Sequence, residues 1–152
     1  MDIKATTVLG AGAWGTALAI SLARKGGPVT LWCRRSDLAK EIEEHRENRP
    51  YLPGHKFPEN LTVTDNLQYA AQSRVILNVT PAQHLRDSLQ SLAAHLNADT
   101  AIVICAKGVE KKSGNLMSDV FEQTLPGQPF AILSGPNFAA EVAQNLPSAT
   151  TL

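Results

Sequence analysis

Short apolar runs rich in β-branched residues alternate along the chain with longer segments in which apolar residues recur every three or four positions. The first pattern is typical of buried strands and the second of amphipathic helices. Strands are therefore predicted at residues 6–9, 29–32, 61–63, 75–79, 101–105 and 130–133. Helices are predicted at about residues 14–25, 36–47, 67–71, 81–96, 116–125 and 137–144.

Capping residues and turn formers mark several of these helix boundaries. Gly26-Gly27 suits a left-handed cap at the end of the first helix. Pro81 fits the first turn of the fourth helix, where its missing N–H costs nothing. The side chains expected to cap helices are Ser36, Asp65 and Thr80. In the fourth helix, helical spacing predicts one buried stripe made of Leu85, Leu89, Leu92 and Leu96.

The segment at residues 48–60 is a loop, because three prolines and a glycine interrupt it. We expect it to pack against the core through Tyr51, Leu52 and Phe57. Its length favours a functional loop over a linker.

The order of elements predicts the fold. Strands alternate with helices and the connections are short, which is typical of a Rossmann-like, doubly wound and mostly parallel α/β sheet with helices on both faces. The run at residues 75–79 and the run at 101–105 have the apolar character of parallel strands buried on both faces. In such a fold, ligands bind at the carboxyl ends of the strands.

Composition narrows the class of protein. A chain of 152 residues with 43% hydrophobic and 18% charged residues fits one globular domain. Its 14 basic and 14 acidic residues balance, so no net field attracts nucleic acid or an anionic membrane. No apolar stretch long enough for a signal peptide or a membrane helix precedes the first glycine turn. We therefore expect a cytoplasmic protein without nucleic-acid binding or membrane insertion.

Cysteine and histidine placement does not point to a metal site. Cys33 and Cys105 fall at the ends of predicted strands without CxxC spacing, which favours two core thiols over a disulfide or a metal pair. The four histidines likewise lack ligand spacing, and a surface position is the default expectation for them. No metal is expected.

The residues Gly10-Ala11-Gly12-Ala13-Trp14-Gly15 form a GxGxxG sequence directly between the first predicted strand and helix. In a dinucleotide-binding unit the first glycine permits the tight turn, the second admits the pyrophosphate and the third lets the helix pack closely on the strand. The positive end of the helix then faces the phosphates. The alternative is an ordinary glycine turn, which the strand-turn-helix context disfavours.

Arg34-Arg35 follows the second predicted strand, where an NAD-specific site usually has an acidic residue. A carboxylate repels a 2′-phosphate, whereas a guanidinium group pairs with it. We therefore expect NADP(H) to be preferred, with NAD(H) also bound. The alternative is that two exposed arginines merely precede a helix.

Two further polar segments follow predicted strands. Lys107-Gly108 can place an ammonium group near a phosphate or carbonyl oxygen, although a solvated loop lysine fits the spacing almost as well. Residues 134–137 (SGPN) remove side-chain bulk at Gly135 and precede a helix whose free N–H groups suit an anion. A simple helix start is the alternative for this segment.

Five dispersed segments together resemble bacterial NAD(P)-dependent glycerol-3-phosphate dehydrogenase, with matching order and spacing along the whole chain. They are residues 10–19 (GAGAWGTALA), 31–34 (LWCR), 48–54 (NRPYLPG), 106–110 (AKGVE) and 134–139 (SGPNFA). The resemblance implies hydride transfer between NAD(P)H and dihydroxyacetone phosphate, giving sn-glycerol 3-phosphate for phospholipid synthesis. It is also compatible with a homodimeric parent enzyme.

The resemblance also implies roles for single residues. The cofactor contacts it implies, together with the glycines of the fingerprint, are Gly10, Gly12, Ala13, Trp14, Gly15, Arg34, Arg35, Lys107 and Ala139. The substrate contacts it implies are Lys107, Gly135 and Asn137.

The resemblance places the catalytic residue outside this chain. The family's catalytic lysine and most of its substrate-phosphate site belong to a helical C-terminal domain. The sequence given stops at Leu152, within residues 149–152 (ATTL), which have the character of a strand. We therefore expect the catalytic lysine to lie beyond Leu152, and residues 1–152 to be the cofactor-binding domain of a longer enzyme, with no catalytic residue of its own.

Two other functions stay open at this point. One is another two-domain NADP-dependent dehydrogenase, acting on a hydroxy acid or an imine. The other is a module that senses redox state by binding NADP(H) without catalysis. The loop at residues 48–54 and the segments at 107–108 and 134–137 favour the phosphorylated triose over the first alternative.

Overall fold

The computed structural model describes residues 5–152; the first four residues, over which the expectation of no signal peptide partly runs, lie outside the described part. The strands are β1 (Thr6–Leu9), β2 (Val29–Trp32), β3 (Leu61–Thr64), β4 (Val75–Asn78), β5 (Ala101–Ile104) and β6 (Phe130–Ile132). The helices are α1 (Ala13–Ala23), α2 (Ser36–His45), α3 (Leu67–Ala70), the 3-10 helix η1 (Ala82–His84), α4 (Leu85–Ala93), α5 (Met117–Thr124) and α6 (Ala139–Ala143).

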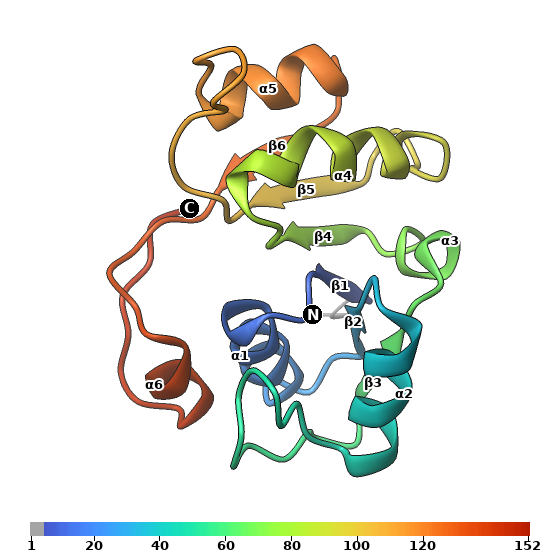
Figure 1. The fold of residues 1–152 in the computed structure, drawn as a ribbon, viewed down its shortest axis with the longest axis vertical. Coiled ribbons are helices and arrows are strands. Elements are labelled where there is room, and N and C mark those ends of the chain that lie inside the picture. Colours follow the sequence, from blue (N-terminus) through green and yellow to red (C-terminus); the bar gives the residue numbers. More distant parts are fainter. Residues whose placement is uncertain (1–4) are drawn as a thin grey trace.

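The strands form one six-stranded sheet in the order β3-β2-β1-β4-β5-β6, and every pair of neighbours is parallel (Figure 1). The chain winds outward from β1 to β3 and then returns past β1 to build the other half of the sheet. This is the order of a dinucleotide-binding doubly wound fold, and the predicted fold class is confirmed.

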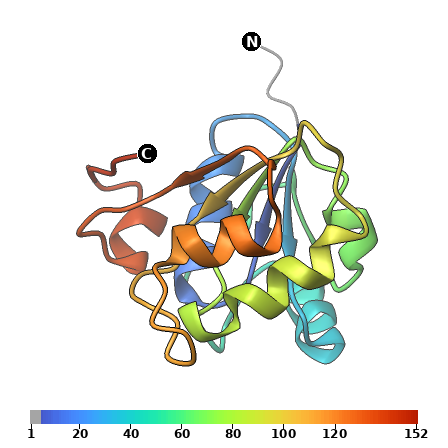
Figure 2. The same cartoon turned by 90° about the horizontal axis from the view of Figure 1, so that it is seen from above.

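The register explains why the strands are so apolar. Val8 is level with Leu31 on one side and with Leu77 on the other, and side chains of this row pack against α1 and α6. Residues of the alternate row, Leu9 and Ile76 among them, pack against α4 and α5. Figure 2 shows α4 and α5 lying together across one face of the sheet. Both faces are therefore buried, as the apolar runs predict.

The helix caps differ from those expected. Asn66 caps α3 instead of Asp65, because its side-chain oxygen accepts a hydrogen bond from the Tyr69 N–H at 3.0 Å. Ser36 is already the first residue of α2 and makes no capping hydrogen bond there. Thr80 lies before η1, and its hydroxyl donates to Asn78 Oδ1 at 2.7 Å instead of capping a helix. The three predicted caps are wrong, since a cap must immediately precede the first helical residue with a free side-chain oxygen.

Expectations about buried apolar side chains are confirmed in most places. The leucine stripe is buried at its first three positions and partly buried at Leu96. In the 48–60 loop Leu52 and Phe57 are buried, as expected. Tyr51 is 48% exposed, so the expectation that it packs against the core is wrong.

The last four described residues are less regular than expected. Residues 149–152 form no strand, and their pairing is limited to a single antiparallel bridge between Ser134 and Thr151. Leu152 lies outside this bridge, and its side chain is 74% exposed. The expectation of a strand running to Leu152 is therefore wrong, because ladder pairing between the two segments is limited to this one bridge.

The two cysteines are buried free thiols, as predicted. Burial raises the pKa of the Cys105 thiol to about 12. Within residues 5–152, no helix has the length and apolar character needed to cross a membrane. The same residues hold no group of three or more histidine, cysteine, aspartate or glutamate side chains suited to a metal ion.

Candidate functional site

The turn between β1 and α1 depends on two glycines for different reasons. Gly10 has a φ of 115°, a conformation that L-residues rarely adopt, and its N–H donates to the Trp32 carbonyl oxygen at 3.1 Å. At Gly15 a Cβ would overlap the carbonyl oxygen of Gly10, so only glycine lets α1 approach the turn this closely. These are the roles predicted for the first and third glycines of the fingerprint.

Gly12 differs from both, because among the described residues nothing beyond its own chain neighbours lies within 4 Å of the position of its Cβ. It is exposed and forms the N-cap of α1, beside the first-turn N–H groups that have no intrahelical partner. Ala13 and Trp14 begin the helix, and both are half-buried. An anionic group can therefore reach the backbone at Gly12 from solvent, and the turn fits a pyrophosphate.

Asn48 supports the glycine turn between β1 and α1 through side-chain hydrogen bonds. It begins a loop in which the sequence identified no chemistry. Its side chain is fully buried, and Nδ2 donates to the Ala11 carbonyl oxygen at 2.9 Å and to Thr16 Oγ1 at 2.8 Å. Among the described residues Oδ1 is a buried acceptor without a partner. The 48–60 loop is thus fastened to the glycine turn.

The two arginines after β2 lie in different environments. Arg34 is exposed at a hollow of about 130 Å³ at the carboxyl ends of β2 and β4. Arg35 instead pairs with Asp37, its Nη2 lying 2.6 Å from Oδ2 and its Nε 3.2 Å from Oδ1. The Arg35 guanidinium holds the pKa of Asp37 at about 2, below the ordinary 3.8. Arg34 is therefore the arginine available to a ligand in the hollow.

The hollow has walls that the sequence did not single out. Besides Arg34, the lining residues are Trp32, Leu67, Thr80, His84, Asp87, Ser88 and Ser91. Buried Asn78 organises part of this wall, because its Oδ1 accepts from the Thr80 N–H at 3.2 Å and its Nδ2 donates to Ser88 Oγ at 3.0 Å. For Thr80 and the wall residues of η1 and α4, only their position after β4 hinted at such a role.

At the other half of the sheet edge, the structure brings together Lys107, Gly135 and Asn137. Lys107 Nζ donates to the Gly135 carbonyl oxygen at 2.8 Å. Asn137 Nδ2 donates to the Ala149 carbonyl oxygen at 2.9 Å. A Cβ on Gly135 would meet that same oxygen at 2.5 Å, so the segment admits no larger residue without moving. The three residues predicted to contact substrate are thus neighbours.

The helix after this segment is shorter than expected. It begins at Ala139 instead of residue 137, so its N–H groups do not start directly after Gly135. Ala139 is half-buried and packs against the cluster shared with α1, beside which α6 lies (Figure 1). Arg24 fastens the two helices, because its Nη1 donates to the Ala143 carbonyl oxygen at 2.5 Å.

A shallow depression of about 350 Å³ lies beside Lys107. Its walls include Gly108, Ser134 and two large apolar side chains, Leu116 and Ile132. These two are 57% and 42% exposed. The Lys107 ammonium group thus borders a hollow that has both polar and apolar walls, at the carboxyl ends of β5 and β6.

Comparison with known proteins agrees with this geometry. The family model described as NAD-dependent glycerol-3-phosphate dehydrogenase N-terminus matches residues 5–152. The chain is 47% identical, over all 152 residues, to glycerol-3-phosphate dehydrogenase [NAD(P)+] of Caulobacter vibrioides, and it covers 46% of that protein. It is 49% identical over 146 residues to the enzyme of that name from Bradyrhizobium diazoefficiens, covering 95% of this chain and 44% of the relative.

A solved structure shows the same likeness. The crystal structure of glycerol-3-phosphate dehydrogenase from Coxiella burnetii matches with a TM-score of 0.90 and 39% sequence identity, covering 97% of this chain and 45% of that one. The chain thus spans a little less than half the length of these relatives.

Proposed function

The chain belongs to the family of N-terminal domains of NAD-dependent glycerol-3-phosphate dehydrogenases, and we propose that it forms the cofactor-binding half of an enzyme that interconverts dihydroxyacetone phosphate and sn-glycerol 3-phosphate. One observation carries the proposal. The open turn at Gly12 and the cluster of Lys107, Gly135 and Asn137 lie along the same edge of the sheet, at the ends of β1, β5 and β6. A dinucleotide bound across this edge has its two ends at two differently built sites.

The residues of the turn and the hollow fit NAD(P)H. The pyrophosphate is held at the turn of Gly10, Gly12 and Gly15 by the backbone N–H groups at the start of α1, where Ala13 and Trp14 contribute further contacts. The Gly10 N–H is already bonded to the Trp32 carbonyl oxygen, so Gly10 shapes the turn. The adenosine end occupies the hollow at Arg34. The nicotinamide supplies the hydride when the cofactor is bound, and Ala139 and Lys107 lie toward that end.

We propose a preference for NADPH over NADH. Arg34 is exposed at the hollow, and the first carboxylate after it, Asp37, is already paired with Arg35. A free guanidinium group suits a 2′-phosphate better than a ribose hydroxyl. Arg35 adds a second positive charge that its ion pair with Asp37 partly cancels.

In the substrate half, Lys107 binds and orients the phosphorylated triose through its ammonium group, which reaches the carbonyl oxygen of Gly135. Gly135 and Asn137 shape the wall beside it. Reduction of a ketone also requires stabilisation of the developing alkoxide and delivery of a proton. The relatives are about twice as long as this chain. We assign these tasks to a helical second domain, with its catalytic lysine beyond Leu152, that covers the two exposed apolar side chains of the depression.

The test uses the complete gene product, in which oxidation of NADPH is followed by absorbance with dihydroxyacetone phosphate present. We expect turnover in the unchanged protein. Lys107→Ala should lower kcat/KM for dihydroxyacetone phosphate at least about tenfold, because an ion pair to the substrate is lost, while the melting temperature stays the same. Lys112→Ala, in the same loop and also exposed, is the matched control. Normal kinetics in Lys107→Ala, or no turnover by the unchanged protein, contradicts the proposal.

A further inference from the structure

The backbone at Lys107 is fixed on both sides within a few residues. Before it, the Cys105 N–H donates to the Asn78 carbonyl oxygen at 2.9 Å and continues the sheet. After it comes Gly108, with a φ of 110°, and then a loop that folds back so that Val109 bridges Leu116. Whatever holds the start of this loop therefore sets the position of Lys107.

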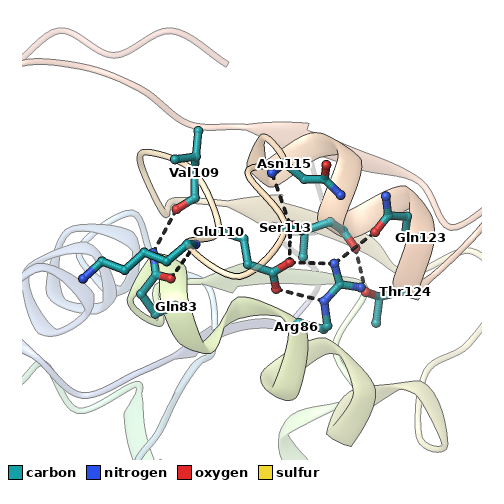
Figure 3. Close-up of polar contacts among 10 residues, drawn as sticks. Gln83, Arg86, Val109, Glu110, Ser113, Asn115, Gln123 and Thr124 are labelled. Atoms are coloured by element: carbon teal, nitrogen blue, oxygen red, sulfur yellow. Dashed lines mark hydrogen bonds and ion pairs between the residues drawn. The ribbon is translucent and has the colours of Figure 1, made fainter.

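Gln83 of η1 holds the loop with both ends of its side-chain amide. Its Nε2 donates to the Val109 carbonyl oxygen at 2.9 Å, and its Oε1 accepts from the Lys111 N–H at 2.9 Å. Figure 3 shows the Gln83 side chain reaching this part of the loop. One glutamine thus adds two hydrogen bonds to a loop whose own pairing is the bridge between Val109 and Leu116.

Arg86 of α4 binds Glu110, the residue between Val109 and Lys111. Its Nε and Nη2 donate to the two carboxylate oxygens of Glu110, each at 2.9 Å. Ser113 Oγ donates to Glu110 Oε2 at 2.6 Å, and Arg86 Nη2 also reaches Gln123 Oε1 of α5 at 3.0 Å (Figure 3). Bidentate arginine-carboxylate pairs combine strength with fixed geometry.

The Glu110 pair is partly withdrawn from water. The residue is only 8% exposed. Arg86, and after it Ser113, hold the pKa of the Glu110 carboxyl at about 2, below the ordinary 4.5. The carboxylate is therefore charged at neutral pH, and loss of its arginine partner would leave a poorly hydrated charge.

Residues 83–88, which belong to η1 and the start of α4, also face the hollow at Arg34. His84, Asp87 and Ser88 line that hollow, whereas Gln83 and Arg86 bond to the loop that follows Lys107. Residues one position apart on a helix point in different directions. The start of α4 therefore stands between the two halves of the site and touches both.

We propose that Gln83, Arg86 and Glu110 form a clamp that positions Lys107 for the phosphorylated substrate, an inference that rests on the function proposed above. The three are positioning residues, because they act through the backbone of residues 108–110 and not by touching the substrate. The clamp aligns the lysine with a cofactor whose adenosine end lies on the other side of the same helix start. Its loss lets the ammonium group sample positions away from Gly135.

A double-mutant cycle in the complete gene product tests the clamp. Glu110→Gln keeps the shape of the side chain and removes its charge, and we expect it to raise KM for dihydroxyacetone phosphate about tenfold while KM for NADPH changes less than about twofold. In a Lys107→Ala background the same change should have little further effect, since the residue it positions is gone. Additive effects in the cycle, or an unchanged KM in Glu110→Gln, would overturn the clamp.

Two further variants distinguish loss of the clamp from a general loss of folding. Gln83→Ala removes two hydrogen bonds to the loop without leaving a buried charge, and it should raise the same KM about threefold. Arg74→Gln removes an exposed arginine ion pair with Asp99 at the opposite end of β4 and should change neither KM. If Arg74→Gln raises KM for dihydroxyacetone phosphate as much as the clamp variants do, the effect is general and the clamp is rejected.

One readout does not depend on enzyme activity. In the 152-residue chain, Lys107 is acylated with an amine-specific reagent and quantified by mass spectrometry against the exposed Lys40 of α2 as internal reference. Glu110→Gln should raise the relative rate at Lys107 about threefold, because the lysine leaves Gly135 more often. A changed rate in this chain, together with no reduction of dihydroxyacetone phosphate by the complete gene product, would reject the proposed function and retain the clamp. An unchanged rate would reject the clamp alone.

Discussion

The side-chain amide of Asn48 donates to the carbonyl oxygen of Ala11 at 2.9 Å, across a sequence separation of 37 residues. Through this bond and its partner to Thr16, the long loop after α2 supports the turn that is open to a pyrophosphate. The glycine fingerprint is therefore not a self-contained motif in this chain. It is shaped in part by a residue outside it.

Asn48→Ala should lower both stability and cofactor affinity. The change leaves a buried carbonyl oxygen and a buried hydroxyl without their donor, which costs about 1–3 kcal/mol of unfolding free energy. Urea denaturation and NADPH titration of the chain measure the two effects. Asn97→Ala, at an exposed asparagine, serves as the control, and equal stability of the two variants would show that the Asn48 contact is unimportant.

The glycines of the turn should separate binding from folding. Gly12→Ala adds a methyl group in open space, so we expect an unchanged melting temperature but at least about a tenfold weaker affinity for NADPH, or about 1.4 kcal/mol. Gly15→Ala forces a methyl group onto the Gly10 carbonyl oxygen and should lower the melting temperature. If Gly12→Ala binds NADPH normally, the pyrophosphate does not lie at this turn.

Arg34 and Arg35 should contribute unequally to cofactor choice. A charge-assisted hydrogen bond is worth about 1.5–3 kcal/mol, and exposure moves the value toward the lower end. Arg34→Ala should therefore weaken NADPH binding about tenfold and leave NADH unchanged, whereas Arg35→Ala, which removes the partner of Asp37, should have a smaller effect. Calorimetric titration with both cofactors decides, and equal affinities for NADPH and NADH in the unmutated chain would contradict the proposed preference.

The Arg86–Glu110 pair should make the stability of the fold decrease at acidic pH. The pKa of Glu110 in the folded protein is about 2, below its ordinary 4.5, so the ionised pair stabilises the fold above that ordinary value and the contribution disappears as the pH falls toward 2. We therefore expect the gap in melting temperature between the unmutated chain and Glu110→Gln to be constant near neutral pH and to narrow below about pH 4.5. Glu59→Gln, at an exposed carboxylate, is the control, and a gap that does not narrow in acid would mean that the carboxylate is not held in its charged form.

The sequence predicted the strands and their parallel arrangement well, because burial on both faces leaves nearly uninterrupted apolar runs such as residues 101–104. The family resemblance grouped Lys107, Gly135 and Asn137 as substrate contacts, and the structure brings them together because the parallel strands before them end at one edge of the sheet. Helix caps were predicted less well. Asp65 and Asn66 are both good capping residues, and only the start of α3 at Leu67 decides between them.

Contacts between distant side chains left no readable signal. Asn48 gave no sign that it reaches back to the glycine turn, and Glu110 gave none that it pairs with Arg86. The different environments of Arg34 and Arg35 depend on a carboxylate two residues after Arg35, whose direction follows from the start of α2. Such relationships depend on how elements pack, and a pattern of residue types does not specify them.

The central claim is that this chain holds the cofactor but does not complete the reaction, and one paired measurement tests it most directly. The 152-residue chain is titrated with NADPH by calorimetry, and NADPH oxidation is then followed by absorbance with saturating dihydroxyacetone phosphate. We predict binding at one site per chain, weakened by Gly12→Ala, together with no measurable turnover, because Lys107 alone cannot orient the ketone, stabilise the alkoxide and deliver a proton. Failure to bind NADPH, or steady turnover by this chain, would contradict the account.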